Sequence, residues 1–253
     1  MPPKCTVNAP PPDELALPPG HLTRGVVRVG DTVRRPPQPS SPFTARLLAH
    51  LELAGCAWAP RYLGTDELGR DVLSFLDGSV PPKWVGFSDA QLRAAALIVR
   101  QLHDVTRDSP IARGAVVCHN DPGPNNFVFR DDVPAALIDF DMAAPGDPLE
   151  DVGYMAWSWC ITSRPSRGPA ALQARQVRVL ADAYRLTEPQ RAQLPESILE
   201  RLQRNISFWT NKLESPGDTL ATPSKVLQLI AWSKRELTYT ETHLSTFAAA
   251  LQP

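Results

Sequence analysis

The feature that most constrains this chain is the stretch 116–151, where short apolar segments each end in a polar loop. The first apolar segment leads into Asp121, and a loop with two prolines and a glycine follows it. Two more, 127–129 and 135–138, are predicted to pair as a β-hairpin, and the second ends at Asp139. Polar side chains at the ends of apolar strands, presented on such loops, are typical of a functional site rather than a core.

These polar side chains match the chemical requirements of phosphoryl transfer. A carboxylate must accept the proton of the attacking hydroxyl, and Asp121 is the candidate for this base. Mg²⁺ prefers hard oxygen ligands, and the amide of Asn126 and the carboxylate of Asp139 are the candidates to hold it. An aspartate or asparagine in a loop is usually only a turn residue, so the prediction depends on the joint occurrence of all three.

The same stretch resembles a known family. The run H-N-D-P-G-P-N-N at 119–126, followed by I-D-F-D at 138–141 and D-P-L-E-D at 147–151, resembles the aminoglycoside phosphotransferase family, relatives of the protein kinases. The resemblance implies a protein-kinase-like, two-lobed α+β fold with a reduced β-containing N-lobe and a mainly helical C-lobe. It also implies that the candidate base and the two candidate Mg²⁺ ligands have those roles.

Other residues of the stretch are expected to support the site. By resemblance, Asp147 and Asp151 brace the catalytic loop and do not react. His119 is interpreted as structural, because the role of the base is already filled. Asp141 is either a contact near the ligands or the substrate, or an exposed turn residue. The two loop prolines are expected to fix the shape of the loop, because proline locks φ.

The phosphates also need a cation from an N-terminal strand, and Arg34 and Arg35 are the candidates. Arg34 lines up with an arginine that many members of the family carry, and Arg35 points to the other face of the strand. A solvated arginine pair is the alternative. Kinases pair this cation with a helix glutamate, but positions 43–45 hold none and Glu52 comes too late. No G-x-G-x-x-G loop is present, so residues 18–20 are predicted to form a minimal nucleotide lid. Weak binding of ATP is therefore an alternative to the usual affinity of a kinase.

Prolines mark the organisation of the chain, since eleven of the 27 lie in the first 42 residues. Residues 1–12 are predicted to be a poorly ordered arm. Residues 13–77 are predicted to form the N-lobe with lid and hinge, and residues 78–253 the C-lobe with the catalytic loop and the acceptor pocket. The hinge is placed near Ser74 and Phe75, which are candidate nucleotide contacts.

Local patterns predict several elements within these lobes. The segment 26–35 is expected to form a hairpin, and 71–76 a strand. Ser88 and Gln91 have the spacing of a capping box and predict the start of a helix. In 199–213, apolar residues recur at intervals of three and four, which predicts an amphipathic helix facing the core.

Composition excludes several classes of protein. Lys and Arg number 26 against 27 Asp and Glu, so no global charge would attract nucleic acid or an anionic membrane. The four cysteines lack the spacing of a zinc site and are interpreted as free, mostly buried thiols. No apolar run is long enough to span a bilayer, and the N-terminus lacks the apolar core of a signal peptide. A cytoplasmic protein is therefore expected.

The resulting hypothesis is an enzyme that uses ATP and Mg²⁺ to phosphorylate a hydroxyl of a small molecule, an antibiotic or a metabolite. Residues 150–253 carry 12 Lys and Arg against 10 Asp and Glu, which favours a neutral or weakly charged alcohol over a polycationic aminoglycoside. Trp157 and Trp159 could line that pocket, but core packing is the more common role.

The alternative to such an enzyme is a kinase-like nucleotide-binding module without catalysis. A serine hydrolase lacks support because G-x-S-x-G is absent. The acceptor and the oligomeric state are not set by these patterns.

Overall fold

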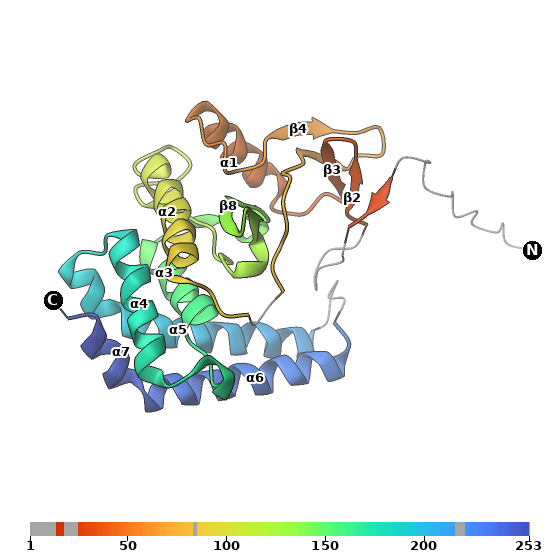
Figure 1. Cartoon of the computed structure of the whole chain (residues 1–253). Coiled ribbons are helices and arrows are strands. Elements are labelled where there is room, and N and C mark those ends of the chain that lie inside the picture. Colours follow the sequence, from red (N-terminus) through yellow and green to blue (C-terminus); the bar gives the residue numbers. More distant parts are fainter. Residues whose placement is uncertain (1–13, 18–24, 83–84, 216–220, 253) are drawn as a thin grey trace, which may run out of the picture.

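A small antiparallel sheet with one helix lies at one end of the molecule, and helices make up most of the other end (Figure 1). This arrangement confirms the predicted α+β class. The structure is a computed structural model, and it describes residues 14–17, 25–82, 85–215 and 221–252. The predicted arm at 1–12 and the predicted lid at 18–20 lie outside the described residues.

Five antiparallel strands form the sheet, in the order β1-β2-β3-β5-β4. The predicted hairpin 26–35 is present, and Gly30 at its turn has a φ of +56°, which glycine adopts without a steric cost. The predicted strand 71–76 is confirmed over its first four residues. The strands are β1 (Leu15–Ala16), β2 (Val27–Val29), β3 (Thr32–Arg35), β4 (Tyr62–Thr65) and β5 (Asp71–Ser74).

Helix α1 (Ser41–Leu53) follows the prolines that end β3. Leu47, Leu48 and Leu51 are buried on one side of the helix and join the main core. On the same helix the hydroxyl of Thr44 donates to the carbonyl oxygen of Phe140 at 3.3 Å. Helix α1 is thereby attached to the segment that carries the predicted catalytic residues.

The link after β5 joins the sheet to the rest of the chain. Ser79 pairs with Phe129 in an isolated antiparallel bridge, with N–O distances of 3.0 and 2.7 Å. Gly78 has a φ of +140°, and a Cβ there would lie 2.4 Å from the carbonyl oxygen of Phe129. The lobe boundary predicted at 77/78 falls inside this link, and it stays a prediction.

Two small two-stranded sheets follow the long helix α2 (Asp89–Thr106). Strand β6 (Val116–Cys118) pairs with β9 (Ala144–Gly146). Strand β7 (Phe127–Arg130) pairs with β8 (Val133–Leu137), as the sequence predicted. Asp131 and Asp132 between them both have positive φ, which is the conformation of a two-residue type I′ turn.

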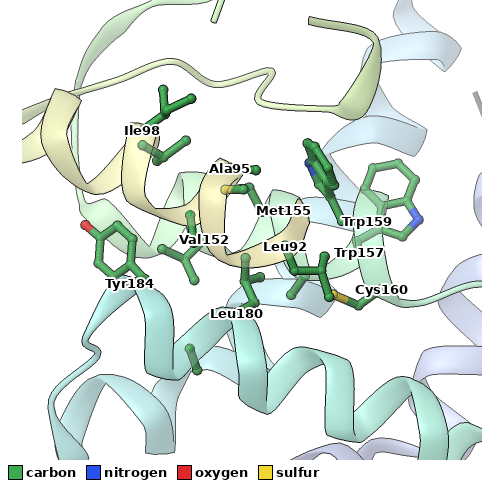
Figure 2. Close-up of a cluster of buried hydrophobic side chains, with 14 of the residues drawn as sticks. Leu92, Ala95, Ile98, Val152, Met155, Trp157, Trp159, Cys160, Leu180 and Tyr184 are labelled. Carbon is green, nitrogen blue, oxygen red and sulfur yellow. The ribbon is translucent and has the colours of Figure 1, made fainter. Parts of the chain in front are cut away.

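The remaining helices pack around a buried core. The predicted capping box at Ser88 and Gln91 is present at the start of α2. Figure 2 shows apolar side chains of α2, of the segment 152–160 and of α4 meeting in one cluster. The helices are α3 (Pro148–Met155), a single π-helical turn (Ala156–Cys160), α4 (Ala170–Tyr184), α5 (Glu188–Glu214), α6 (Pro223–Thr242) and α7 (Leu244–Ala250).

The predicted stripe on α5 is only partly right. Leu202 and Trp209 are buried as expected, but Leu199 is half-buried. The first half of the helix instead buries Leu194 and Ile198. The buried face of the helix is therefore rotated from the predicted one, and the helix packs against both α3 and α6.

Two cysteines and the lengths of the helices can be compared with what the composition predicted. Cys118 and Cys160 are buried and unpaired, and burial raises the pKa of Cys160 to about 12. Such thiols are neutral and poorly reactive. Within the described residues, no helix is both long and apolar enough to cross a membrane.

Candidate active site

The predicted base and one predicted metal ligand are in direct contact. Strand β6 leads into the loop, where the side-chain amide of Asn126 donates to the Oδ2 atom and to the backbone oxygen of Asp121, both at 2.8 Å. Pro124 opens a short 3-10 turn that ends at Asn126, which is consistent with a loop shaped by its prolines. The indole of Trp159 donates to the carbonyl oxygen of Pro122 at 2.9 Å and holds the middle of the loop.

The buried carboxylate of Asp151 holds the backbone of the catalytic loop. Asp151 has no exposed surface, and it accepts from the backbone N–H groups of His119 at 2.6 Å and of Asn120 at 2.7 Å. The imidazole of His103 lies 3.0 Å from the same carboxylate. Although burial alone would raise it, the pKa of Asp151 is lowered by the hydrogen bond and the charge of His103 and by His119. This placement matches the bracing role that the sequence suggested.

Asp147 and His119 also have structural contacts. Asp147 caps helix α3 by accepting from the backbone of Leu149 at 2.8 Å. His119 is buried, and its Nδ1 accepts from the backbone of Asp121 at 3.3 Å while Nε2 donates to the carbonyl oxygen of Ile138 at 3.0 Å. Both nitrogens are used to connect the loop to the end of β8, so His119 is structural here.

The second predicted metal ligand follows the paired strand. Asp139 has a left-handed conformation, with a φ of +67°. Asp139 is exposed to solvent, although the protein around its carboxyl group partly desolvates it. This desolvation, and then the charges of Asp141 and Asp121, raise its pKa, while His119 and Arg35 oppose the shift.

This donor set fits Mg²⁺. Asp139 supplies a carboxylate, and its repulsion from the neighbouring carboxylates of Asp141 and Asp121 is relieved by a divalent cation. The Oδ1 atom of Asn126 accepts one hydrogen bond, from Asn125 at 2.9 Å, which leaves its second lone pair. Oxygen ligands of this kind are those that Mg²⁺ prefers.

The structure separates the two candidate arginines. Arg34 lies on one face of β3, where its guanidinium is 3.4 Å from Asp66 in the turn before β5. Arg35 lies on the other face, is 6% exposed, and its Nη1 atom is 2.5 Å from the carboxylate of Asp141. Only Arg35 therefore reaches the segment that carries Asp139. Asp141, for which two roles were open, forms an ion pair and is not a free turn residue.

The two hinge candidates lie at the end of β5. The backbone N–H of Ser74 donates to Arg61 at 2.9 Å, and that of Phe75 donates to Asp31 at 2.8 Å. The guanidinium of Arg28 covers the Phe75 ring, 3.7 Å from its centroid. Both N–H groups are therefore already used within the sheet region and are not available to a nucleotide base.

Comparison with known proteins places this site in a family. A family profile described as "Phosphotransferase enzyme family" (APH) matches residues 107–193. The chain is 31% identical to the trifolitoxin immunity protein of Rhizobium leguminosarum bv. trifolii, and the similarity covers 94% of this chain and 99% of that protein. The chain belongs to the phosphotransferase family.

Solved structures share the family fold. A choline/ethanolamine kinase family protein from Mesorhizobium loti superposes with a TM-score of 0.61 at 19% identity, covering 94% of this chain and 92% of that one. The streptomycin–ATP–APH(2")-IIa ternary complex gives a TM-score of 0.55 at 14% identity, covering 86% and 92%. These matches confirm the predicted kinase-like fold, and with the profile they support a small-molecule phosphotransferase.

Two residues that contact the catalytic loop of this phosphotransferase, directly or through each other, were missed by the sequence analysis. The hydroxyl of Tyr154, on α3, donates to the Oδ1 atom of Asp121. Arg201, on α5, lies over the Tyr154 ring at 4.6 Å from its centroid and donates to the carbonyl oxygen of Asn120. Tyr154 follows Asp151 by three residues on the same helix, so this spacing was the available signal.

The two tryptophans belong to the core. Trp157 is 3% exposed and Trp159 has no exposed surface. Both side chains lie in the cluster of apolar side chains drawn in Figure 2. Trp157 stacks on Trp232 of α6, with ring centroids 5.3 Å apart. Of the two roles considered from the sequence, packing is the one observed, and Trp159 adds the hydrogen bond to the loop.

Proposed function

We propose that this protein transfers the γ-phosphoryl group of ATP, with Mg²⁺, to a hydroxyl group of a small molecule. The observation that carries the proposal is the joint placement of three side chains. Asp121 is held by Asn126 on a loop that the buried Asp151 anchors, and the N–H of Ile138, the residue before Asp139, donates to the backbone oxygen of Asn126 at 2.8 Å. A core or a simple turn does not require this combination.

The placement of Asp121 indicates which bonds change and where the proton goes during phosphoryl transfer. The acceptor oxygen forms a bond to the γ-phosphorus while the bond from that phosphorus to the bridging oxygen of ADP breaks. The acceptor proton passes to the carboxylate of Asp121. A carboxylate has about four lone-pair sites, and Asn126 and Tyr154 use two of them, so an acceptor hydroxyl can still bind. Mg²⁺, when bound, neutralises charge on the phosphates.

The donor nucleotide is proposed on two grounds. ATP is the nucleotide in the APH(2")-IIa complex, which shares this fold. In this chain, Arg35 is the arginine that extends toward Asp139, so we assign it to the phosphates, whereas Arg34 pairs with Asp66. Ser74 and Phe75 are proposed to contact the nucleotide through groups other than their N–H groups.

The acceptor is proposed to be a neutral or weakly charged alcohol. Arg201 places a positive charge against the loop of the catalytic base. Glu150 on α3 and Glu200 on α5 are both paired with Arg204, at 2.6 and 2.7 Å. Two acids of the helical part are thus already neutralised and a guanidinium lies at the loop of the base, which disfavours binding of a polycation.

An ATP turnover assay over a panel of hydroxylated compounds tests the function. The panel contains neutral alcohols, aminoglycosides and trifolitoxin, since the full-length relative is named for immunity to that toxin. Asp121→Asn is expected to abolish phosphorylation of any acceptor found, whereas Asp131→Asn, in the exposed turn of the β7–β8 hairpin, retains it. Activity that survives Asp121→Asn contradicts the mechanism.

A binding measurement separates the alternative function. A nucleotide-binding module without catalysis shows an Mg²⁺-dependent thermal shift with ATP but no turnover on any acceptor. No thermal shift with Mg-ATP contradicts both functions.

A further inference from the structure

We propose that Asp71, on strand β5, anchors the phosphate-binding guanidinium of Arg35 and so performs the task of the absent helix glutamate. The inference rests on the proposed function, because it concerns the nucleotide site of that reaction. It assigns Asp71 as a positioning residue, which acts on the phosphates only through Arg35.

Strand register brings the two residues together. Arg35 on β3 and Asp71 on β5 are direct cross-strand partners. The Nε atom of Arg35 lies 3.6 Å from the Oδ2 atom of Asp71, and the two residues are 6% and 1% exposed. Because both charges are removed from water, their attraction is little screened.

Two neutral hydroxyl donors fix the Asp71 carboxylate. Ser41, at the start of α1, donates to Oδ2 at 2.5 Å, and Tyr62 on β4 donates to Oδ1 at 3.2 Å. Each carboxylate oxygen is thus held by a different element, and neither donor neutralises the negative charge. The carboxylate remains in one orientation with its charge available to Arg35.

Helix α1 offers no acid that could do this. Its first turn contains no acidic residue, and its buried polar positions are the hydroxyl residues Ser41 and Thr44. Glu52, near its end, is exposed and lies 3.7 Å from Arg61 on the surface. In this chain the acidic partner of the strand cation therefore lies on the neighbouring strand and not on the helix, and α1 contributes only a hydroxyl that orients it.

The opposite end of the guanidinium faces the catalytic segment. Nη1 of Arg35 lies 2.5 Å from Asp141, two residues after the proposed metal ligand Asp139. The ion pair of Nε with Asp71, at 3.6 Å and without a hydrogen bond, holds the guanidinium with its Nη1 atom beside Asp141, where phosphate oxygens would bind. A guanidinium fixed in this way binds phosphate with less loss of side-chain freedom.

Nucleotide binding by the purified full-length chain tests the proposal without a known acceptor. Dissociation constants are measured by calorimetry for Mg-ATP, Mg-ADP and adenosine. Asp71→Asn is expected to weaken both phosphate-bearing nucleotides by about tenfold or more, the effect of one charge-assisted contact, and to leave adenosine within about twofold. Arg35→Gln is expected to give the same selective loss, and the double variant no further loss.

Arg34→Gln is the matched comparison, because Arg34 lies on the opposite face of the same strand and pairs with Asp66. It is expected to leave all three dissociation constants within about twofold. If the pair were merely structural, its loss would weaken the binding of adenosine and of ATP by the same factor. That result, or unchanged dissociation constants in Asp71→Asn, overturns the proposal. If Asp71→Asn does not fold, Ser41→Ala, which removes a hydroxyl that orients Asp71, takes its place and is expected to give the same selective loss at a smaller size.

Failure of the proposed function is a different result. If the wild-type chain binds Mg-ATP with the expected selectivity but phosphorylates nothing, the function fails and the anchoring role stands. If turnover is found but Asp71→Asn binds Mg-ATP as the wild type does, the anchoring role fails and the function stands. A wild-type chain that binds no nucleotide contradicts both.

Discussion

Replacing Asp151 by asparagine is expected to destabilise the protein more than any other conservative change in the 147–151 motif. The wild-type carboxylate accepts three buried hydrogen bonds, at 2.6, 2.7 and 3.0 Å. A hydrogen bond to a charged group contributes about 1.5–3 kcal/mol. The amide of asparagine keeps one acceptor oxygen but turns its NH₂ group toward at least one N–H donor, which leaves that donor buried and unpaired.

The expected loss is about 3–5 kcal/mol in the free energy of unfolding, as is usual when one partner of a buried charged contact is removed. For a chain of this size, 1 kcal/mol shifts Tm by about 2–4 °C. We therefore expect Tm to fall by roughly 6–20 °C in a thermal melt followed by circular dichroism at neutral pH. Asp147→Asn is the control, because it replaces a helix cap by another good cap and costs only a few tenths of a kcal/mol.

The effect depends on pH with a defined sign. The pKa of Asp151 is lowered in the folded state from 3.8, so its stabilisation is fully present above that value and is lost as the pH falls through the lower folded pKa. The difference in stability between wild type and Asp151→Asn should be constant near neutral pH and should narrow below about pH 4. A loss no larger than that of Asp147→Asn, or a difference that narrows above pH 5, refutes the reasoning.

Three further changes have expected outcomes. Gly78→Ala places a Cβ 2.4 Å from the carbonyl oxygen of Phe129, so we expect a Tm lower by several degrees; an unchanged Tm contradicts this. Tyr154→Phe removes the hydroxyl on Asp121 and should lower kcat on the identified acceptor about threefold to thirtyfold with the fold intact. Equal loss in an adenosine-binding measurement would argue for misfolding instead. Glu236→Gln weakens the bonds from Ser163, at 2.9 and 2.7 Å, and should cost about 1–3 kcal/mol in urea denaturation.

The parts of the fold that were predicted from the sequence are those set by neighbours along the chain. The β7–β8 hairpin follows from two apolar segments around a two-residue turn, and the start of α2 follows from the Ser88 capping box. The contact between Asp121 and Asn126 likewise spans only five positions. These interactions require no knowledge of how distant elements pack.

The missed features depend on packing between distant elements. Whether Arg34 or Arg35 faces the catalytic segment depends on how the sheet is oriented against α1 and the 139–141 segment, and the period of two in a strand leaves both choices open. The partner of Arg35 is chosen by the register of β3 against β5. On α5, the buried face depends on how the helix packs against both α3 and α6.

The reacting groups themselves are few, and each is held by buried residues that do not react. Asp121 is oriented by Asn126 and Tyr154, and Asp151 holds the backbone beneath it. Loss of a conventional supporting residue therefore does not imply loss of the function, provided that another element can place an equivalent charge at the same point. In the sheet of this protein, strand pairing places Asp71 opposite Arg35, so the chain can keep a fixed cation beside its catalytic segment although helix α1 carries no acid there.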